Sequence, residues 1–192
     1  MRIIFLDVDG VLNCMSTKDD APCGCIGVDS RKVEVLKKIL EESRKEEETE
    51  VVLSSSWRVH VDRFGHRQSD KDFLYLLDKL KEQDITLYDE TPLIDEAHRG
   101  VEIRRWLYER QNLPITGILI IDDEAFDFKN NGLSRFHMRT SFYNSGNGGL
   151  QEKHLRQAMK LLHLEVPRYL FTEFVKTYEE REKERDTDYE RV

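Results

Sequence analysis

The first residues that could do chemistry are two aspartates near the N-terminus, Asp7 and Asp9, with Gly10 directly after them. Asp7 follows the apolar run Arg2–Leu6, so both carboxylates lie at the end of an expected strand and point to the same side of it. Neighbouring carboxylates repel each other, so one becomes protonated or both bind a cation. The pattern is typical of a nucleophile beside a general acid, or of a site for a hard metal ion, although a turn after a strand is the simpler alternative.

A second group of polar residues follows the short apolar run 51–53. It contains Ser54, Ser55 and Ser56, with Arg58 two residues later. Hydroxyl groups at the end of a strand can donate hydrogen bonds to an anionic ligand, and an arginine adds positive charge. Serines also cap helices, so this segment taken alone is consistent with the start of a helix.

Acidic residues follow a third apolar run, 118–121. Asp122, Asp123 and Glu124 come in succession, and Asp127 is close behind. Three acids at the end of a buried strand are costly unless a cation or a basic side chain compensates their charge. A helix cap would explain one aspartate here but does not account for the pair.

The runs that carry these residues are typical of buried parallel strands, because they are short, almost continuously apolar and end in polar residues. Segments with apolar residues three and four positions apart alternate with them and predict helices. We expect a helix capped by Asp29 or Ser30, helices over 100–111 and 151–164, and one more short strand over 85–88. Another helix, capped by Ser69, is expected to have a buried face formed by Phe73, Leu74, Leu77 and Leu80. This alternation predicts an α/β fold, a three-layer sandwich around a mostly parallel sheet, in which ligands bind beyond the carboxyl ends of the strands.

Length and composition restrict the class of protein further. The 192 residues fit one domain with a sizeable core. Lys and Arg number 30 against 38 Asp and Glu, and the resulting net charge of −8 opposes indiscriminate binding to nucleic acid or to an anionic membrane. No apolar run is long enough to span a bilayer, and the N-terminus lacks the order of a signal peptide. We therefore expect a soluble, cytoplasmic protein.

Three cysteines, Cys14, Cys23 and Cys25, are too few and too close together for a disulfide framework, so we expect reduced thiols. Zinc binding by the last two with His60 or His66 is the alternative. Its spacing is not that of a common zinc site, so it is the weaker interpretation.

The C-terminal part of the chain differs in composition from the rest. From Tyr178 onward almost every residue is charged, which predicts a helical extension or a disordered tail. Phe171, Phe174 and Tyr178 have the spacing of a helix that packs on a core or on a partner. We expect one domain over residues 1–165 and a charged, helical extension over residues 166–192.

In their order along the chain, the motifs resemble those of the haloacid dehalogenase (HAD) superfamily of phosphatases with an aspartate nucleophile. The superfamily pattern is an apolar strand and D-x-D-G, a serine or threonine after the next strand, a lysine or arginine, and an acidic pair after a later strand. The matching residues here are Asp7, Asp9, Ser55 or Ser54, Arg99, Asp122 and Asp123. The segments FLDVDGVLN, VVLSSSWR, HRGVEIRRWL and IIDDE are similar to the HAD domain of Swiss Army Knife RNA-repair proteins, and the resemblance covers about residues 1–165.

The resemblance implies a role for each matching residue. Asp7 would attack phosphorus and become an aspartyl-phosphate, and Asp9 would protonate the leaving oxygen and then activate water. Ser55, or Ser54 if the register differs by one, would bind the phosphoryl group. The resemblance therefore implies a phosphatase with a covalent intermediate.

The resemblance also implies a magnesium ion as cofactor. Asp7, the backbone carbonyl of Asp9 and the side chain of Asp123 would hold it. Asp122 would orient its neighbours or bind a water of the metal. Mg²⁺ suits such a site because it takes a few carboxylates and completes its octahedron with phosphate oxygen and water.

The basic residue of the pattern would be Arg99, where the family often has a lysine, with Arg58 as the alternative; either would bind the phosphate. The segments after the first two motifs are too short for the cap domains that the family inserts there. An open site suits a large substrate such as an RNA or DNA end phosphate, and the basic stretch 58–67 could bind its backbone. A phosphoprotein phosphatase of the same mechanism, or a non-catalytic adaptor with the HAD fold, are the alternatives.

Overall fold

The computed structural model describes residues 1–59, 71–94, 98–144 and 146–172. Within them five parallel strands form one sheet in the order β3-β2-β1-β4-β5. The strands are β1 Arg2–Leu6, β2 Thr49–Leu53, β3 Leu87–Glu90, β4 Gly117–Asp122 and β5 His137–Arg139. Leu6 at the end of β1 pairs with Leu53 of β2 and with Ile121 of β4. The three strand ends that carry the polar motifs therefore lie side by side.

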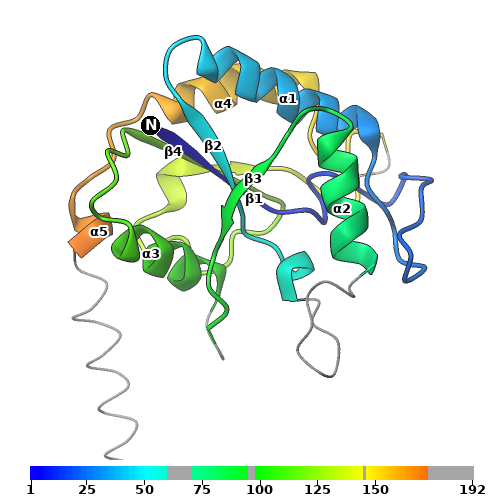
Figure 1. The fold of residues 1–192 in the computed structure, drawn as a ribbon, viewed down its shortest axis with the longest axis horizontal. Helices are drawn as coiled ribbons and strands as arrows, with labels where there is room; N and C mark the ends of the chain where they lie inside the picture. The colour runs from blue at the N-terminus through cyan, green and yellow to red at the C-terminus, as the bar shows by residue number, and fades with distance from the viewer. Residues whose placement is uncertain (60–70, 95–97, 145, 173–192) are drawn as a thin grey trace, which may run out of the picture.

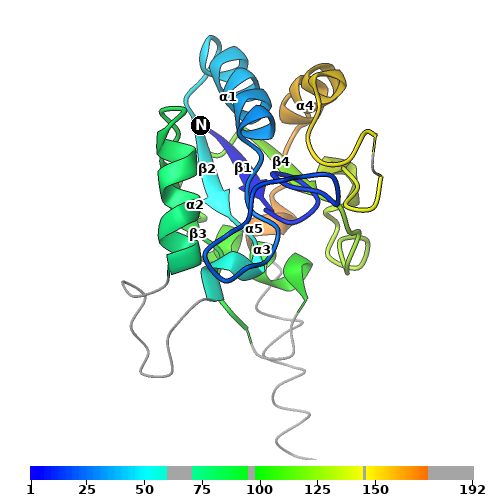
Figure 2. The same cartoon turned by 90° about the vertical axis from the view of Figure 1, so that its right-hand side faces the viewer.

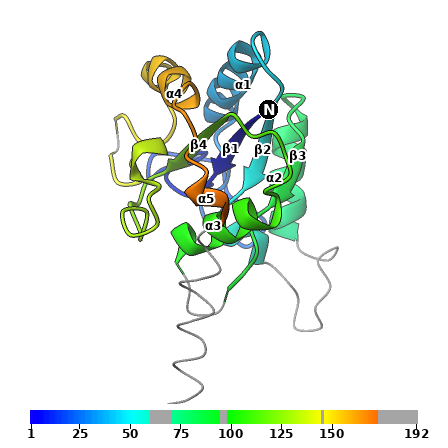
Figure 3. The same ribbon diagram turned by 90° about the vertical axis from the view of Figure 1, so that its left-hand side faces the viewer.

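Helices cover both faces of the sheet, and Figures 1 and 3 show α1 and α4 on one side of it and α3 and α5 on the other. The helices are α1 Ser30–Arg44, α2 Lys71–Lys81, α3 Arg99–Glu109, α4 Leu155–Leu162 and α5 Tyr169–Thr172. Successive residues of β1 face opposite layers: Ile4 and Leu6 pack with α1, α2 and α4, whereas Ile3 and Phe5 pack with α3 and α5. The predicted α/β sandwich with a parallel sheet is confirmed.

The start of α1 follows the local sequence. Asp29 is the residue before the helix, and its carboxylate accepts a hydrogen bond from the backbone N–H of Arg31 at 3.0 Å. Val33, Leu36 and Leu40 are buried against the sheet, as their spacing predicts. In Figure 2 the helix lies beside α4, which covers the same face of the sheet.

The prediction for α2 is wrong in one respect. Leu74, expected on the buried face, is 44% exposed, and Leu76 is buried in its place. Leu76 and Leu80 are four residues apart and form the stripe that packs on the core. The expected cap at Ser69 lies outside the described residues.

The strand after α2 begins at Leu87, two residues later than expected. Ile85 lies instead in the turn that follows the helix, where its backbone N–H donates to the carbonyl of Leu80 at 3.1 Å. Asp84, just before it, has a left-handed φ of 57°, which is how many helices end. Ile85 is buried there by the turn rather than by the sheet.

The connections after the first two strands are short. Residues 7–29 join β1 to α1 as a loop with one isolated bridge between Asp20 and Ile26. After β2 the described chain continues as a short 3₁₀ turn, Ser56–Val59. Among the described residues, no large cap domain is inserted at either place, as the sequence predicts.

The prediction of reduced cysteines is wrong for two of the three. Cys23 and Cys25 form a disulfide, whereas Cys14 is a buried free thiol. Gly24 between them has φ 83°, which lets the chain turn back so that the two sulfurs meet. Because these sulfurs bond each other, they are not zinc ligands; His60 and His66 of that alternative lie outside the described residues.

The described part of the C-terminal segment packs on the domain. Leu170 of α5 is fully buried against α3, and Arg104 of α3 donates to the carbonyls of Leu170 and Tyr169 at 3.1 and 3.0 Å. Phe174 and Tyr178 lie outside the described residues. None of the described helices has the length and apolar character that crossing a membrane requires.

Candidate active site

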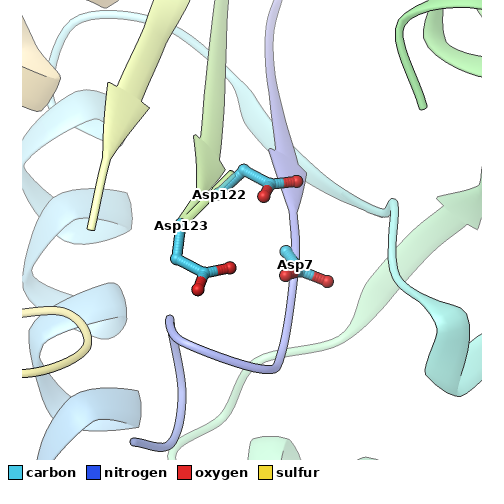
Figure 4. A group of neighbouring side chains, drawn as sticks. All are labelled: Asp7, Asp122 and Asp123. Atoms are coloured by element: carbon cyan, nitrogen blue, oxygen red, sulfur yellow. The ribbon is translucent and has the colours of Figure 1, made fainter. Parts of the chain in front are cut away.

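Three carboxylates meet where β1 and β4 end. Asp7 follows β1, Asp122 is the last residue of β4, and Asp123 is the next residue along the chain. Figure 4 shows their side chains converging, and one oxygen of each lies within 4.8 Å of the others. The parallel register explains this convergence, because the backbone N–H of Asp7 donates to the carbonyl of Ile121 at 3.0 Å. The acidic motifs predicted at two strand ends form one cluster.

Arg99 is the basic residue that contacts this cluster. Its Nη1 lies 2.7 Å from Oδ1 of Asp7 and 2.9 Å from Oδ2 of Asp122. The three side chains are at most 11% exposed, so the pairing takes place largely out of water. The guanidinium also lies over the ring of Phe126, 4.9 Å from its centroid. One guanidinium for three carboxylates leaves negative charge uncompensated.

The start of α3 fixes the position of Arg99. The carboxylate of Asp127 accepts hydrogen bonds from the backbone N–H of Gly100 and from Nδ2 of Asn131, both at 2.7 Å. A Cβ at Gly100 would lie 2.5 Å from Oδ1 of Asp127, so only glycine allows this approach. Asp127 therefore holds the first turn of the helix beside the acidic cluster.

Burial and mutual repulsion raise the pKa values of the clustered carboxyl groups. Burial, and then the charge of Asp7, raise the pKa of Asp122 to about 8, although Arg99 opposes the shift. Burial and the charges of Asp7 and Glu124 raise the pKa of Asp123 to about 6. Burial also raises the pKa of Asp7, against the effect of Arg99. The cluster therefore has the hard oxygen donors and the excess charge that suit a divalent cation such as Mg²⁺.

Asp9 lies outside the cluster and is held by two side chains. One carboxylate oxygen accepts a hydrogen bond from Nε1 of Trp57 at 2.9 Å, and the other from Nδ2 of Asn13 at 2.8 Å. Asn13 in turn accepts a hydrogen bond from the backbone N–H of Gly10 at 3.0 Å. The sequence reasoning missed both partners, although Asn13 and Trp57 stand in the segments FLDVDGVLN and VVLSSSWR.

The turn at Gly10 packs directly on the acidic cluster. Gly10 has φ 72°, and a Cβ there would lie 2.3 Å from Cγ of Asp123. Its carbonyl accepts a hydrogen bond from the Thr140 hydroxyl at 2.6 Å, and the backbone N–H of Thr140 donates to the carbonyl of Asp122 at 3.1 Å. Thr140 thus ties the turn after β1 to the end of β4.

The two candidate serines have different surroundings. The Ser55 hydroxyl hydrogen-bonds the carboxylate of Asp7. Oγ of Ser54 is buried and makes no hydrogen bond within the part of the chain that the structure describes. The structure therefore brings Ser55 to the expected nucleophile and does not bring Ser54 into hydrogen-bond contact with it.

Arg58, the alternative basic residue, pairs with a different acid. Its guanidinium forms a buried ion pair with Glu102 of α3, with the two side chains 3% and 8% exposed. Nη1 also donates to the backbone carbonyl of Ser55 at 2.5 Å. The structure thus joins Arg99, and not Arg58, to the clustered carboxylates by ion pairs.

A family model for the HAD domain in Swiss Army Knife RNA repair proteins matches residues 3–155. The chain belongs to this family. The match extends over most of the chain, from β1 to the first residue of α4, so α5 and the C-terminal segment lie beyond the matched HAD domain. No curated protein matches the chain.

All residues of the acidic site fall within the matched HAD domain. Along the chain the D-x-D-G motif comes first, the serines after β2 second, Arg99 third and the acidic pair after β4 last, which is the order of the superfamily pattern given above. The architecture agrees as well, with a parallel sheet between helices and no large cap in the described residues.

Proposed function

We propose that this HAD domain is a Mg²⁺-dependent phosphatase that removes a terminal phosphate from a nucleic acid through an aspartyl-phosphate on Asp7. One observation carries the proposal. The Asp7 carboxylate contacts both the Arg99 guanidinium and the Ser55 hydroxyl, and two further carboxylates lie beside it. A nucleophile, donors for phosphoryl oxygens and ligands for a cation are what phosphoryl transfer requires.

In the first step, an oxygen of Asp7 attacks phosphorus. The new oxygen–phosphorus bond forms while the bond from phosphorus to the leaving oxygen breaks. Asp9 donates a proton to the leaving oxygen, and the hydrogen bonds from Trp57 and Asn13 keep its carboxyl group oriented. Ser55 donates a hydrogen bond to the phosphoryl group.

In the second step, a water molecule attacks the phosphorus of the aspartyl-phosphate. Asp9, now without its proton, accepts a proton from that water. The bond between phosphorus and the Asp7 oxygen breaks, which releases inorganic phosphate and restores the Asp7 carboxylate. Arg99 stabilises the negative charge of both states, since its guanidinium is already in contact with Asp7.

The side chains of Asp7 and Asp123 and the backbone carbonyl of Asp9 would hold Mg²⁺. Asp123 is favoured over Asp122 as the second carboxylate because Arg99 pairs with both Asp7 and Asp122, whereas no ion pair within the described residues joins it to Asp123, which leaves this carboxylate for a cation. When bound, the ion would neutralise charge on the phosphoryl oxygens. Asp122 would then keep Arg99 in position.

The proposal is tested by release of phosphate, with and without Mg²⁺, from RNA and DNA oligonucleotides phosphorylated at the 5′ or 3′ end, from phosphopeptides and from p-nitrophenyl phosphate. We expect Mg²⁺-dependent turnover that is fastest on an oligonucleotide and is lost in Asp7→Asn. Faster turnover of phosphopeptides would contradict the substrate class. Equal rates for the wild type and Asp7→Asn would contradict the mechanism, and capture of a stable partner without any turnover would favour the adaptor alternative.

A further inference from the structure

A pocket of about 670 Å³ joins the proposed catalytic residues to an aromatic surface. Its lining includes Asp9, Trp57 and Asp123, and also Phe142 and Tyr143. The side chain of Tyr143 is 80% exposed, the highest exposure among the large apolar side chains that the structure describes. Its ring meets the ring of Phe142 edge to face, with centroids 5.2 Å apart.

This aromatic pair is anchored to the site through the backbone. The N–H of Phe142 donates to the carboxylate of Asp123, and its carbonyl accepts a hydrogen bond from the N–H of Met15 at 3.1 Å. The backbone of Phe142 thus contacts Asp123, one of the three clustered carboxylates, and Tyr143 is the next residue along the chain. Tyr143 contributes little to the core, because most of its side chain faces solvent. An exposed aromatic surface at a largely apolar pocket indicates a binding site for a flat, apolar group.

We infer that Phe142 and Tyr143 form a stacking site for the nucleobase of the nucleotide whose phosphate is presented to Asp7. The inference rests on the proposed phosphatase function and names the part of the substrate that sets its specificity. Unpaired bases bind proteins by stacking on aromatic rings, and every base offers such a face. The pocket volume is within the range of small-molecule sites and admits a group of the size of a nucleoside.

The charge of the pocket decides how many phosphates the nucleotide carries. Asp72 and Glu124 line it together with Asp9 and Asp123. Asp9 is protonated when it acts as the acid and Mg²⁺ would compensate Asp123, but the exposed carboxylate of Glu124 repels any phosphate beyond the one that reacts. The occupant is therefore a nucleoside with a single phosphate, either free or at the end of a chain, rather than a di- or triphosphate.

A nucleobase fits this pocket better than the ring of a phosphotyrosine. Glu124 is exposed at the rim, and its carboxylate can accept hydrogen bonds from the N–H groups of a base. A phenyl ring has no such donors. The family match, to a domain of RNA repair proteins, favours the same ligand class.

The experiment compares kcat/KM for adenosine 5′- and 3′-monophosphate with kcat/KM for glycerol phosphate, which has no base. We expect Tyr143→Ala to lower the ratio of nucleotide to glycerol phosphate about tenfold, because stacking of one base is lost. Tyr143→Phe keeps the ring and is expected to restore the ratio. Tyr88→Ala serves as the matched control, since Tyr88 is 47% exposed on β3 and does not line the pocket.

A ratio that stays the same in Tyr143→Ala would overturn the inference, as would an equal dependence of phosphotyrosine peptide hydrolysis on Tyr143. If the wild type hydrolyses none of these esters, the phosphatase proposal fails. The stacking site is then tested separately, by equilibrium dialysis that measures the binding of adenosine monophosphate in the presence of Mg²⁺. Affinity about tenfold weaker in Tyr143→Ala supports the site, and unchanged affinity rejects it. Stronger binding of an end-phosphorylated oligonucleotide than of the mononucleotide assigns the site to chain ends, and equal binding assigns it to free nucleotides.

Discussion

Two arginines near the carboxyl ends of the strands, the buried Arg58 and the partly buried Arg99, have different surroundings. Arg58 forms an ion pair with one carboxylate, that of Glu102. Arg99 contacts two carboxylates, those of Asp7 and Asp122, and a third, Asp123, belongs to the same cluster. Arg58 and Glu102 thus form a one-to-one ion pair, whereas three acids share one guanidinium around Arg99.

This difference separates a structural ion pair from a site that can bind a ligand. A buried pair with equal charges needs nothing further, and its cost appears only when one partner is removed. A cluster with excess negative charge must bind protons or a cation, and the raised pKa of Asp122 reflects that demand. Uncompensated charge at a strand end therefore locates the chemistry better than the presence of an arginine does.

The largest expected effect tests the cluster itself. Asp7→Asn should lower phosphate release at least ~10⁴-fold, because an amide oxygen is a poor nucleophile and cannot form the acyl phosphate. The matched control is Asp84→Asn, which removes a carboxylate whose side chain is 91% exposed. Circular dichroism should show the same fold for both variants. Turnover by Asp7→Asn within tenfold of the wild type would remove Asp7 from the mechanism.

The balanced pair should respond in stability rather than in catalysis. Glu102→Gln leaves Arg58 buried without its counter-charge, so the free energy of unfolding should fall by about 3–5 kcal/mol in urea titrations. Asp122→Asn should lower it by less than about 1 kcal/mol without Mg²⁺, since the change relieves repulsion with Asp7. Equal losses in the two variants would mean that the two regions do not differ as argued.

The sequence alone locates the carboxylates but not their partners. Asp7, Asp122 and Asp123 could be predicted to meet because each follows a local apolar run, and parallel strands end together. The choice between Arg99 and Arg58 depends on Glu102, which is 44 residues from Arg58 and has no local signal. The same holds for Trp57, whose contact with Asp9 spans 48 residues.

The sequence likewise predicts the general architecture of the fold but not all of its local details. The layers around a parallel sheet follow from the alternation of strand and helix patterns, and the cap of α1 follows from Asp29. The failures are local: Leu74 has the hydrophobicity of a core residue but lies on the exposed side of α2, and Ile85 lies in the turn after that helix rather than at the start of a strand. Tertiary packing decides both, and periodicity does not show which of several leucines faces the sheet.

A smaller effect tests the metal ligands. Mg²⁺ at a hundredfold excess over its dissociation constant should stabilise the folded domain by about 2.7 kcal/mol, seen as a rise in melting temperature. Asp123→Asn should lose most of this rise. Ser55→Ala should keep the rise while its turnover falls, because the hydroxyl binds phosphate rather than metal. A melting temperature that rises equally with Mg²⁺ in Asp123→Asn would exclude Asp123 as a ligand.

The smallest effect is the pH dependence of stability without metal. The pKa values of Asp122, about 8, and Asp123, about 6, are raised above their values in the unfolded chain. These two carboxyl groups therefore bind more protons in the folded state than in the unfolded state between about pH 4 and 8, and their contribution to the free energy of unfolding falls as pH rises through that window.

Burial lowers the pKa of His137 and of His154, so near pH 6.5 their protons are bound mainly by the unfolded state and oppose this fall. Measurement between pH 6.5 and 8 in the wild type and in Asp122→Asn separates the carboxylates from these histidines. We expect a decrease of the order of 1 kcal/mol across this range after solvent screening. Asp122→Asn should flatten the decrease, whereas Glu102→Gln should leave the slope unchanged. Mg²⁺ binds the deprotonated carboxylates, so the rise in melting temperature that it causes should grow with pH. The opposite result would be a free energy of unfolding of the metal-free wild type that rises from pH 6.5 to 8. It would show that Arg99 compensates the negative charge of its carboxylates as fully as Arg58 compensates that of Glu102.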